Sequence, residues 1–259
     1  MPFSMNNLLA SGNRALGGAA DTLDAAVGAS SRMWNGFQPF GWLAGRYHYQ
    51  GTLGGRWRAN DWKITAIGGA GTTLVPADGT PPTATFITRA TADGDGYNLQ
   101  WSMDGGTTIQ EVFKPTAGLN IYFECKMKLD NAADDAHTKG RFYVGISDVD
   151  TDLHGSVSNF IGFYKASGAD TFAGVLDASS QTLTTSTGTI ANDTYITLGF
   201  RVNGVSSVDF FVNGVLLEHQ TTVTDLPSTD MCLTIQGETS EAAAITYSFQ
   251  NIVCWQESF

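Results

Sequence analysis

The segment from Ile121 to Leu129 alternates strictly between apolar and polar side chains. The apolar positions are Ile121, Phe123, Cys125, Met127 and Leu129. Because successive side chains of a strand point to opposite faces, this pattern predicts a strand with one buried face and one wet face. The same alternation recurs within 142–146, 196–202 and 245–255, with turn-forming clusters between the runs. We therefore expect an all-β chain folded as an antiparallel jelly-roll sandwich.

A hairpin is predicted where Asn213-Gly214 separates the apolar runs VDFFV and VLLEHQ. Both turn residues tolerate positive φ, which a two-residue hairpin turn requires. This turn would pair Asp209 with Glu218 and Phe210 with Leu217. The core face would then contain Val208, Phe210, Val212, Val215 and Leu217.

The register of the strand that precedes this hairpin is inferred by elimination. A two-residue turn at Asn203-Gly204 would set Leu198 opposite Asp209 on the polar face, because a one-residue slip turns every side chain over. A three-residue turn over 203–205 instead sets Leu198 opposite Phe210, so we expect the longer turn.

The predicted pair of Asp209 and Glu218 lies on the outer or concave face of the sheet. Like charges that face each other across a hairpin are mildly destabilising. The two groups are candidates for acid–base chemistry or for holding a cation. The alternative that we favour is a pair of solvated surface carboxylates, because no third polar partner is visible.

Composition excludes several classes of partner. Charged residues make up 15% of the chain, against about 25% in an average globular protein. The formal net charge is −11 and no run of basic residues occurs, so we expect no nucleic-acid partner. The N-terminus has no basic region followed by an apolar run, and no stretch approaches the ~18 apolar residues of a membrane span. Neither a secretory signal nor a membrane partner is predicted.

The chain divides into three predicted regions: an arm over 1–33, an irregular aromatic-rich connection over 34–61, and the jelly roll over 62–259. The arm is expected to be extended or partly helical. Its candidate assembly residues follow a heptad-like spacing and are Leu9, Leu16, Leu23 and Val27. Glycines weaken any isolated helix here. One alternative is a flexible tail, and the one that we favour is an arm that orders against a neighbouring subunit.

Two groups of residues are candidates for ligand binding. Trp57, Trp62 and Trp101 could stack on sugar rings, although a tryptophan more often lies in a core or an interface. Asp148, Asp150 and Asp152 resemble the start of a calcium loop. The match then fails, because Leu153 and Asn159 replace the expected glycine and glutamate. Calcium is therefore one alternative and a metal-free acidic turn is the other, and no other cofactor is predicted.

The order of the segments YFECKMKL, RFYVGISDVDTDL, NFIGFYKA, YITLGFRVNGVSSVDFFVNGVLLEHQ and MCLTIQGETSEAAAITYSFQNIVCW resembles the concanavalin A-like (laminin-G-like) jelly-roll domains. The similarity is greatest to the versions found in tailed-phage virion proteins. It covers roughly residues 110–259, and by extension the β region from about residue 60.

The resemblance implies a fold directly and a function only by analogy. It implies a non-enzymatic virion structural protein, either capsid-decorating or fibre-like, that is made in the host cytoplasm and attached to other virion or capsid subunits through its N-terminal region. A homo-oligomer, with a trimer favoured, is the expected assembly. The alternative is a lectin-like module that binds a host glycan. A glycoside hydrolase ranks last, because the E-x-D-x-E run of the glucanases of this fold is absent.

Overall fold

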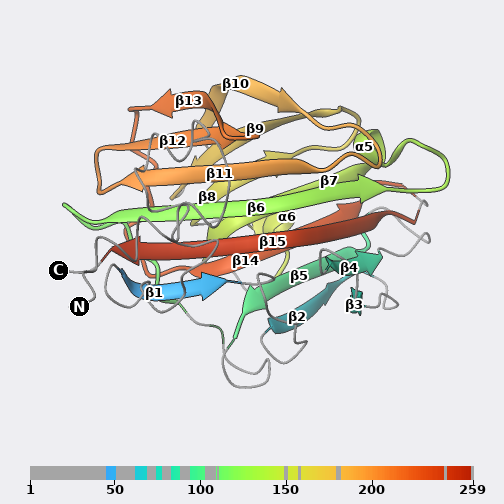
Figure 1. The fold of residues 1–259 in the computed structure, drawn as a ribbon, viewed down its shortest axis with the longest axis horizontal. Helices are drawn as coiled ribbons and strands as arrows, with labels where there is room; N and C mark the ends of the chain where they lie inside the picture. The colour runs from blue at the N-terminus through green and yellow to red at the C-terminus, as the bar shows by residue number, and fades with distance from the viewer. Residues whose placement is uncertain are drawn as a thin grey trace, which may run out of the picture.

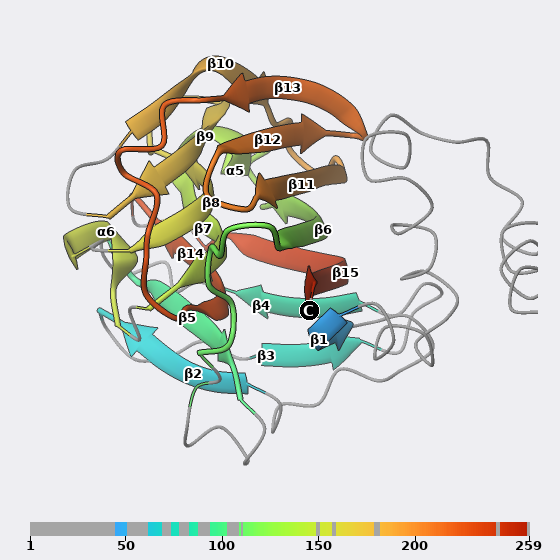
Figure 2. The same cartoon turned by 90° about the vertical axis from the view of Figure 1, so that its left-hand side faces the viewer.

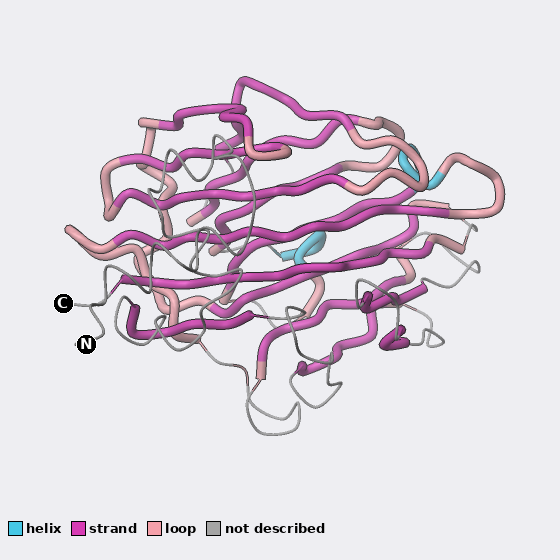
Figure 3. Tube along the Cα trace, in the orientation of Figure 1, coloured by secondary structure: helices cyan, strands magenta, loops and turns pink. Residues whose placement is uncertain are grey.

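The computed structural model of the chain is a two-layer β-sandwich (Figure 1). It describes residues 45–50, 62–68, 74–77, 83–87, 94–102, 109, 111–148, 151–156, 159–178, 182–241 and 244–257. Strands dominate these residues, and the helical segments are short (Figure 3). All pairings between the strands are antiparallel, so the predicted all-β antiparallel jelly-roll class is confirmed.

One layer is an eight-stranded sheet in the order β13-β12-β11-β6-β15-β4-β3, with β1 paired to β15 beside this path. Its strands are β1 (Gly45–Gln50), β3 (Leu74–Ala77), β4 (Thr83–Ile87), β6 (Asn120–Asp130), β11 (Ile196–Asn203), β12 (Ser207–Val212), β13 (Val215–Gln220) and β15 (Thr246–Glu257).

The other layer is a seven-stranded sheet in the order β10-β9-β8-β7-β14-β5-β2. Its strands are β2 (Trp62–Ile67), β5 (Gly96–Trp101), β7 (Gly140–Ser147), β8 (Phe160–Lys165), β9 (Thr171–Asp177), β10 (Thr182–Thr189) and β14 (Cys232–Thr239). The short helices are α5 (Ala136–Lys139) and α6 (Leu153–Ser156). No helix within the described ranges is long and apolar enough to cross a membrane.

The hydrophobic core lies between the two sheets, as the alternation predicts. The five apolar side chains of β6 are fully buried, whereas Glu124, Lys126 and Lys128 keep partial exposure. Aromatic rings join the layers: the centroids of Phe163 on β8 and Phe210 on β12 lie 5.4 Å apart in an edge-to-face arrangement. Side chains of both sheets therefore interdigitate in one core.

The β12–β13 hairpin departs from the predicted register. The turn at Asn213-Gly214 forms, with both residues at positive φ, and Phe211 pairs with Leu216 as predicted. A bulge between Phe210 and Phe211 then shifts the pairing, so Asp209 lies opposite His219 and not opposite Glu218. An extra residue in one strand changes every pairing beyond it. The predicted carboxylate pair is therefore wrong.

Two further details of this region also differ from the prediction. Leu198 pairs with Val212, and Phe200 with Phe210, around a loop over 204–206. The predicted pairing is wrong, yet the core-facing residues are correct, because the side-chain period of a strand is two. Val215, predicted to face the core, is 60% exposed.

The segment over 34–61, predicted to be irregular, contains a strand. β1 pairs with residues of β15 from Val253 to Glu257. Further along β15, β4 pairs with Thr246 to Phe249. β1 and β4 thus follow each other along one side of the last strand, and the sheet extends upstream of the predicted boundary at residue 62.

Candidate functional site

A band of charged and aromatic side chains lies on the outer face of the seven-stranded sheet. Phe142, Val144 and Ile235 point into the core, so Arg141 and Tyr143 of β7, together with the alternate residues of β14, point outward. α6 covers this face on the side away from the other sheet (Figure 2). The outward residues are therefore buried without belonging to the main core.

Gln236 connects the two acidic groups of this band. Its Nε2 donates to Asp152 Oδ1 at 2.8 Å and also to Glu238 Oε1, while its Oε1 accepts from the backbone N–H of Leu153 at 2.8 Å. Asp152 Oδ1 also accepts from the backbone N–H of His154 at 2.8 Å. One amide side chain therefore holds both carboxyl groups and fixes the chain segment that covers them.

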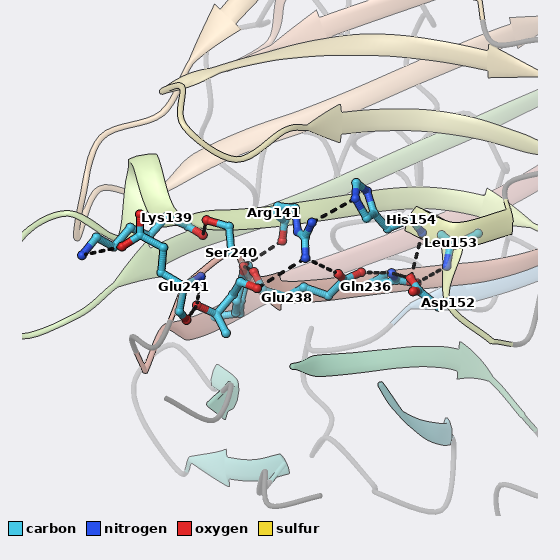
Figure 4. A network of polar contacts seen from close by, with 11 residues as sticks. Lys139, Arg141, Asp152, Leu153, His154, Gln236, Glu238, Ser240 and Glu241 are labelled. Atoms are coloured by element: carbon cyan, nitrogen blue, oxygen red, sulfur yellow. Dashed lines mark hydrogen bonds and ion pairs between the residues drawn. The ribbon is translucent and has the colours of Figure 1, made fainter. Parts of the chain in front are cut away.

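Arg141 joins Glu238 to His154 (Figure 4). Its Nη2 lies 3.1 Å from Glu238 Oε2, and its Nη1 lies 2.9 Å from His154 Nε2. An arginine side chain can only donate, so Nε2 of His154 must accept, which assigns the neutral imidazole with its proton on Nδ1. Arg141 is buried, but His154 is exposed.

The same band continues towards α5 in Figure 4. Lys139 forms ion pairs with Asp135 at 3.0 Å and with Glu241 at 3.2 Å, and its carbonyl accepts from Ser240. These groups are half-buried or exposed and contribute little individually. They mark the solvated end of the network.

Aromatic and apolar side chains form the other part of the outer face. Tyr143 and Tyr164 stack with their ring centroids 4.6 Å apart, and Tyr143 meets Phe160 edge-to-face at 5.4 Å. Leu153 of α6, fully buried, packs in the same cluster. Burial raises the pKa of Tyr143 and of Tyr164. Tyr164 remains partly exposed, so it presents a ring at the edge of the cluster.

Glu238 is a carboxyl group of this network whose acidity is strongly altered. Burial raises its pKa to about 7, and the nearby negative charge of Asp152 acts in the same direction. The hydrogen bond from Gln236 and the charge of Arg141 oppose this rise without cancelling it. Near neutral pH the group is thus balanced between an acid that can donate a proton and a base that can accept one.

Two of the three predicted sugar-stacking tryptophans lie in the core. Trp62 on β2 is 2% exposed and Trp101, its partner on β5, is 9% exposed. Both rings pack in the core cluster between the sheets, so the sugar-stacking alternative is wrong for these two residues. Trp57 lies outside the described residues, as do the predicted arm residues Leu9, Leu16, Leu23 and Val27.

The predicted calcium ligands have other partners. Asp148 Oδ2 accepts from Asn159 Nδ2 at 2.6 Å, and Asp152 belongs to the Gln236 network. Asp150 lies outside the described residues. Within the described ranges, no group of three or more His, Cys, Asp or Glu side chains lies close enough to hold a metal ion.

Asp209 is surrounded by Arg201, Asn203 and His219 in place of the predicted Glu218. It accepts from Arg201 Nη2 at 2.6 Å, from Arg201 Nε at 3.0 Å and from Asn203 Nδ2 at 3.0 Å, and it contacts His219 Nδ1. Burial acts to raise its pKa, but the hydrogen bonds from Asn203, His219 and Arg201 outweigh it and lower the pKa. This cluster fixes the base of the hairpin.

Sequence reasoning missed Arg141, Gln236 and Glu238. Their signal was present: each alternates with core residues, as in the run Leu233 to Glu238. Alternation alone assigns such residues to a solvated face. Their burial arises because the segment over 151–156 folds across them, and no local pattern reports that contact.

Comparison with known proteins adds the fold but no family. No family model and no curated protein matches the chain. Among solved structures, the carbohydrate recognition domain of Emp47p has a TM-score of 0.54 at 10% identity, over 82% of this chain and 96% of that one. An endo-1,3-beta-glucanase from Streptomyces sioyaensis has a TM-score of 0.52 at 14% identity, over 83% and 97%. The alginate lyase A1-II', a member of polysaccharide lyase family-7, has a TM-score of 0.52 at 9% identity, over 78% of this chain and 96% of that one.

These structures are concanavalin A-like jelly-roll sandwiches, so that part of the resemblance holds. They overturn the prediction that the chain is not an enzyme, because a glucanase and a lyase share its fold. The predicted absence of catalysis relied on the missing E-x-D-x-E run, which concerns one group of enzymes only.

Proposed function

We propose that this chain is a carbohydrate-binding jelly-roll protein and that it contacts its glycan on the outer face of the seven-stranded sheet. The observation that carries the proposal is the accessible rim of the buried network. His154 is exposed, while Asp152 and Tyr164 are partly exposed. Each is held from beneath by buried groups.

The chemistry of this rim matches that of a sugar chain. A pyranose offers hydroxyl groups around an apolar face, and it is recognised by charged hydrogen-bonding groups beside an aromatic ring. Hydrogen bonds to charged groups contribute about 1.5–3 kcal/mol each, and an aromatic contact contributes about 0.5–1.5 kcal/mol beyond its buried area. Because Arg141 and Gln236 already fix His154 and Asp152, little side-chain entropy would be lost on binding. The fold shared with the carbohydrate recognition domain of Emp47p supports the same function.

A glycan array followed by calorimetry tests the proposal. We expect at least one polysaccharide fragment to bind, and Tyr164→Ala or His154→Ala to weaken that binding roughly ten-fold, as the loss of about 1.4 kcal/mol would do. His219→Ala is the matched control for His154→Ala, since His219 is also exposed and also contacts a buried charged partner, on the opposite sheet. The absence of any ligand, or equal binding by all three variants, would refute the proposal.

Cleavage of the bound glycan is a second candidate function, and Glu238 favours it. Glu238 Oε1 and Asp152 Oδ1 accept from one nitrogen of Gln236, so these two oxygens lie within two hydrogen-bond lengths, about 6 Å, of each other. This arrangement is nearer to the close carboxyl pair of retaining glycosidases, about 5–5.5 Å, than to the wider pair of inverting ones. One proton-bearing acid beside one carboxylate suits the close-pair geometry of retaining enzymes. Glu238 is 2% exposed beneath residues 151–153, so a substrate can reach it only by displacing this segment.

Product analysis separates cleavage from binding. Wild-type protein would release reducing ends, or products that absorb in the ultraviolet if a lyase, from the polysaccharide that it binds. Glu238→Gln would abolish the release and retain binding. If the wild type leaves every bound polysaccharide intact, only the binding function remains.

Attachment to a virion is a separate proposal that derives from the sequence resemblance. It requires the apolar residues of the arm to assemble against a neighbour. Replacing Leu9, Leu16 and Leu23 by Ser should lower the native mass or abolish particle attachment without unfolding the jelly roll. An unchanged mass together with unchanged attachment would refute it.

A further inference from the structure

A pocket of about 280 Å³ opens at the end of the sandwich where α5 lies. It is lined by His137 of α5, Asp170 before β9, the end of β10, the start of β11 and Asn213 of the hairpin turn. Residues of both sheets therefore enclose it. It lies at the sandwich end and not on the outer face, so an inference about it does not rest on the function proposed above.

The floor of the pocket is apolar and fixed. Ile190 is 3% exposed and Ile196 is 5% exposed. The backbone N–H of Ile190 donates to the carbonyl of Asp170 at 2.9 Å, which ties one wall to the floor. Such hydrogen bonds hold the pocket open in advance, so binding would not have to order it.

Two residues that line the pocket have hydrogen-bonding atoms with unused capacity. Nδ1 of His137 is buried and has no hydrogen-bond partner among the described residues. Buried polar atoms without a partner are rare, and each calls for a ligand, a water or a functional explanation. Asn213 is held by two contacts with the backbone of Thr197, at 2.8 and 2.9 Å, through its N–H and its Oδ1. Its Nδ2 takes part in neither contact and remains a donor.

The charges around the pocket restrict the class of ligand. Asp170 carries the one formal negative charge among the lining residues, and no lysine or arginine lines the pocket. The carboxylate of Asp170 disfavours an anion beside it. The ammonium groups of Lys126 and Lys128 lie 5.3 Å from the centroid of the Tyr195 ring, and they disfavour a cation on that side, so a neutral ligand fits better than either ion. A carboxylate accepts hydrogen bonds from two neighbouring hydroxyl groups, and the isoleucine floor suits an apolar ring face.

We propose that this pocket binds one neutral sugar ring, with Ile190 and Ile196 beneath it and with Asp170, His137 and Asn213 on its hydroxyl groups. The volume supports a single ring, because it lies just below the roughly 300 Å³ at which pockets for larger small molecules begin. A ligand of this size is expected to bind with a dissociation constant of roughly 1 mM.

Saturation-transfer NMR with the methyl glycosides of glucose, mannose, galactose and N-acetylglucosamine tests this proposal. At least one probe should receive saturation from the wild type. Ala191→Phe, which places a ring in the pocket from an exposed position, should abolish the effect, and Asp170→Asn should weaken binding about ten-fold. Asp134→Asn is the matched control, since Asp134 is exposed, lies before α5 outside the pocket, and has a positive φ that asparagine tolerates.

Two results would overturn the proposal: no saturation of any probe by the wild type, or full saturation in Ala191→Phe. Tyr164→Ala separates this site from the outer face. It should leave monosaccharide binding at the pocket unchanged even where it weakens binding of a longer glycan. Loss of monosaccharide binding in Tyr164→Ala but not in Ala191→Phe would place the sugar on the outer face and refute the pocket.

Discussion

Arg141 and Glu238 face each other across β7 and β14 as an ion pair of 3.1 Å, with both side chains less than a tenth exposed. Despite this pairing, the pKa of Glu238 rises to about 7, because burial and the charge of Asp152 outweigh Arg141. Relative to the unfolded chain, folding therefore favours the neutral acid.

Glu238 should make stability depend on pH. Its pKa rises on folding from 4.5 to about 7, so its stabilising contribution is complete below pH 4.5 and is lost as pH rises through 7. In Glu238→Gln this loss of stability does not occur, because a glutamine side chain does not titrate. Between pH 4 and pH 8 the free energy of unfolding of the variant should gain up to about 3 kcal/mol relative to wild type.

Urea denaturation across this pH range measures the gain. Asp230→Asn, at an exposed position, is the control and should show no such trend. If the difference between Glu238→Gln and wild type is constant with pH, the carboxyl group is not buried as described.

Lys165 should produce the opposite dependence on pH. It is fully buried, donates to the carbonyls of Gly140 at 2.6 Å and Ala166 at 2.9 Å, and has its pKa lowered by burial to about 8. A lowered pKa means that the stability associated with the neutral amine is present above pH 10.5 and lost as pH falls through 8. The stability of Lys165→Met relative to wild type should therefore fall by up to about 3 kcal/mol from pH 7 to pH 10.5.

The tyrosines titrate in both Lys165→Met and the wild type. The difference in unfolding free energy between these two proteins at each pH therefore removes the contribution of the tyrosines. Lys114→Met, at an exposed lysine, provides the control. A difference that does not change with pH would show that the Lys165 ammonium is not desolvated.

Asp209→Asn should be destabilising. It removes the charge that accepts two hydrogen bonds from Arg201 and contacts His219, and loss of a buried ionic partner costs about 2–4 kcal/mol when the other charge stays partly solvated. A lowered midpoint of urea unfolding is the expected result. The predicted repulsion from Glu218 would instead make both Asp209→Asn and Glu218→Gln stabilising, so a rise in both midpoints would contradict the observed register.

Gly174→Ala tests how closely the sheets approach. A Cβ atom at Gly174 would lie 2.7 Å from ring atoms of Phe210, and overpacking of this kind costs about 1–3 kcal/mol. Phe210→Leu replaces the opposing ring by a smaller side chain. Because the two residues are in contact, the double variant should lose less stability than the sum of the two single variants. Additive losses, measured by urea denaturation, would show that the contact does not exist.

Much of the fold could be predicted from single strands. The alternation of Ile121 to Leu129 identified the buried face of β6 correctly, and Asn213-Gly214 identified the turn of the hairpin. Register was harder. The bulge after Phe210 adds one residue to one strand, and its cost is repaid by Arg201, Asn203 and His219 around Asp209, which are contacts that the pattern of a single strand does not contain.

The candidate site was predictable in part. Asp152 was one of three candidate calcium ligands, with a metal-free turn as the alternative, and the structure makes it a partner of Gln236. Trp62 and Trp101 were candidates for sugar stacking, with a core position as the alternative, and they pair across β2 and β5 in the core. An aromatic residue beside turn residues gives the same local signal whether it faces the solvent or the opposite sheet.

The sequence alone determined which side chains of each strand share a face, because that follows from the two-residue period of the backbone. Only the tertiary structure decided what covers each face. Leu153 and Gln236 are joined by a hydrogen bond across 83 positions of the chain, and this contact buries Glu238 and raises its pKa. Desolvation depends on atoms that are close in space, and residues far apart in sequence supply them.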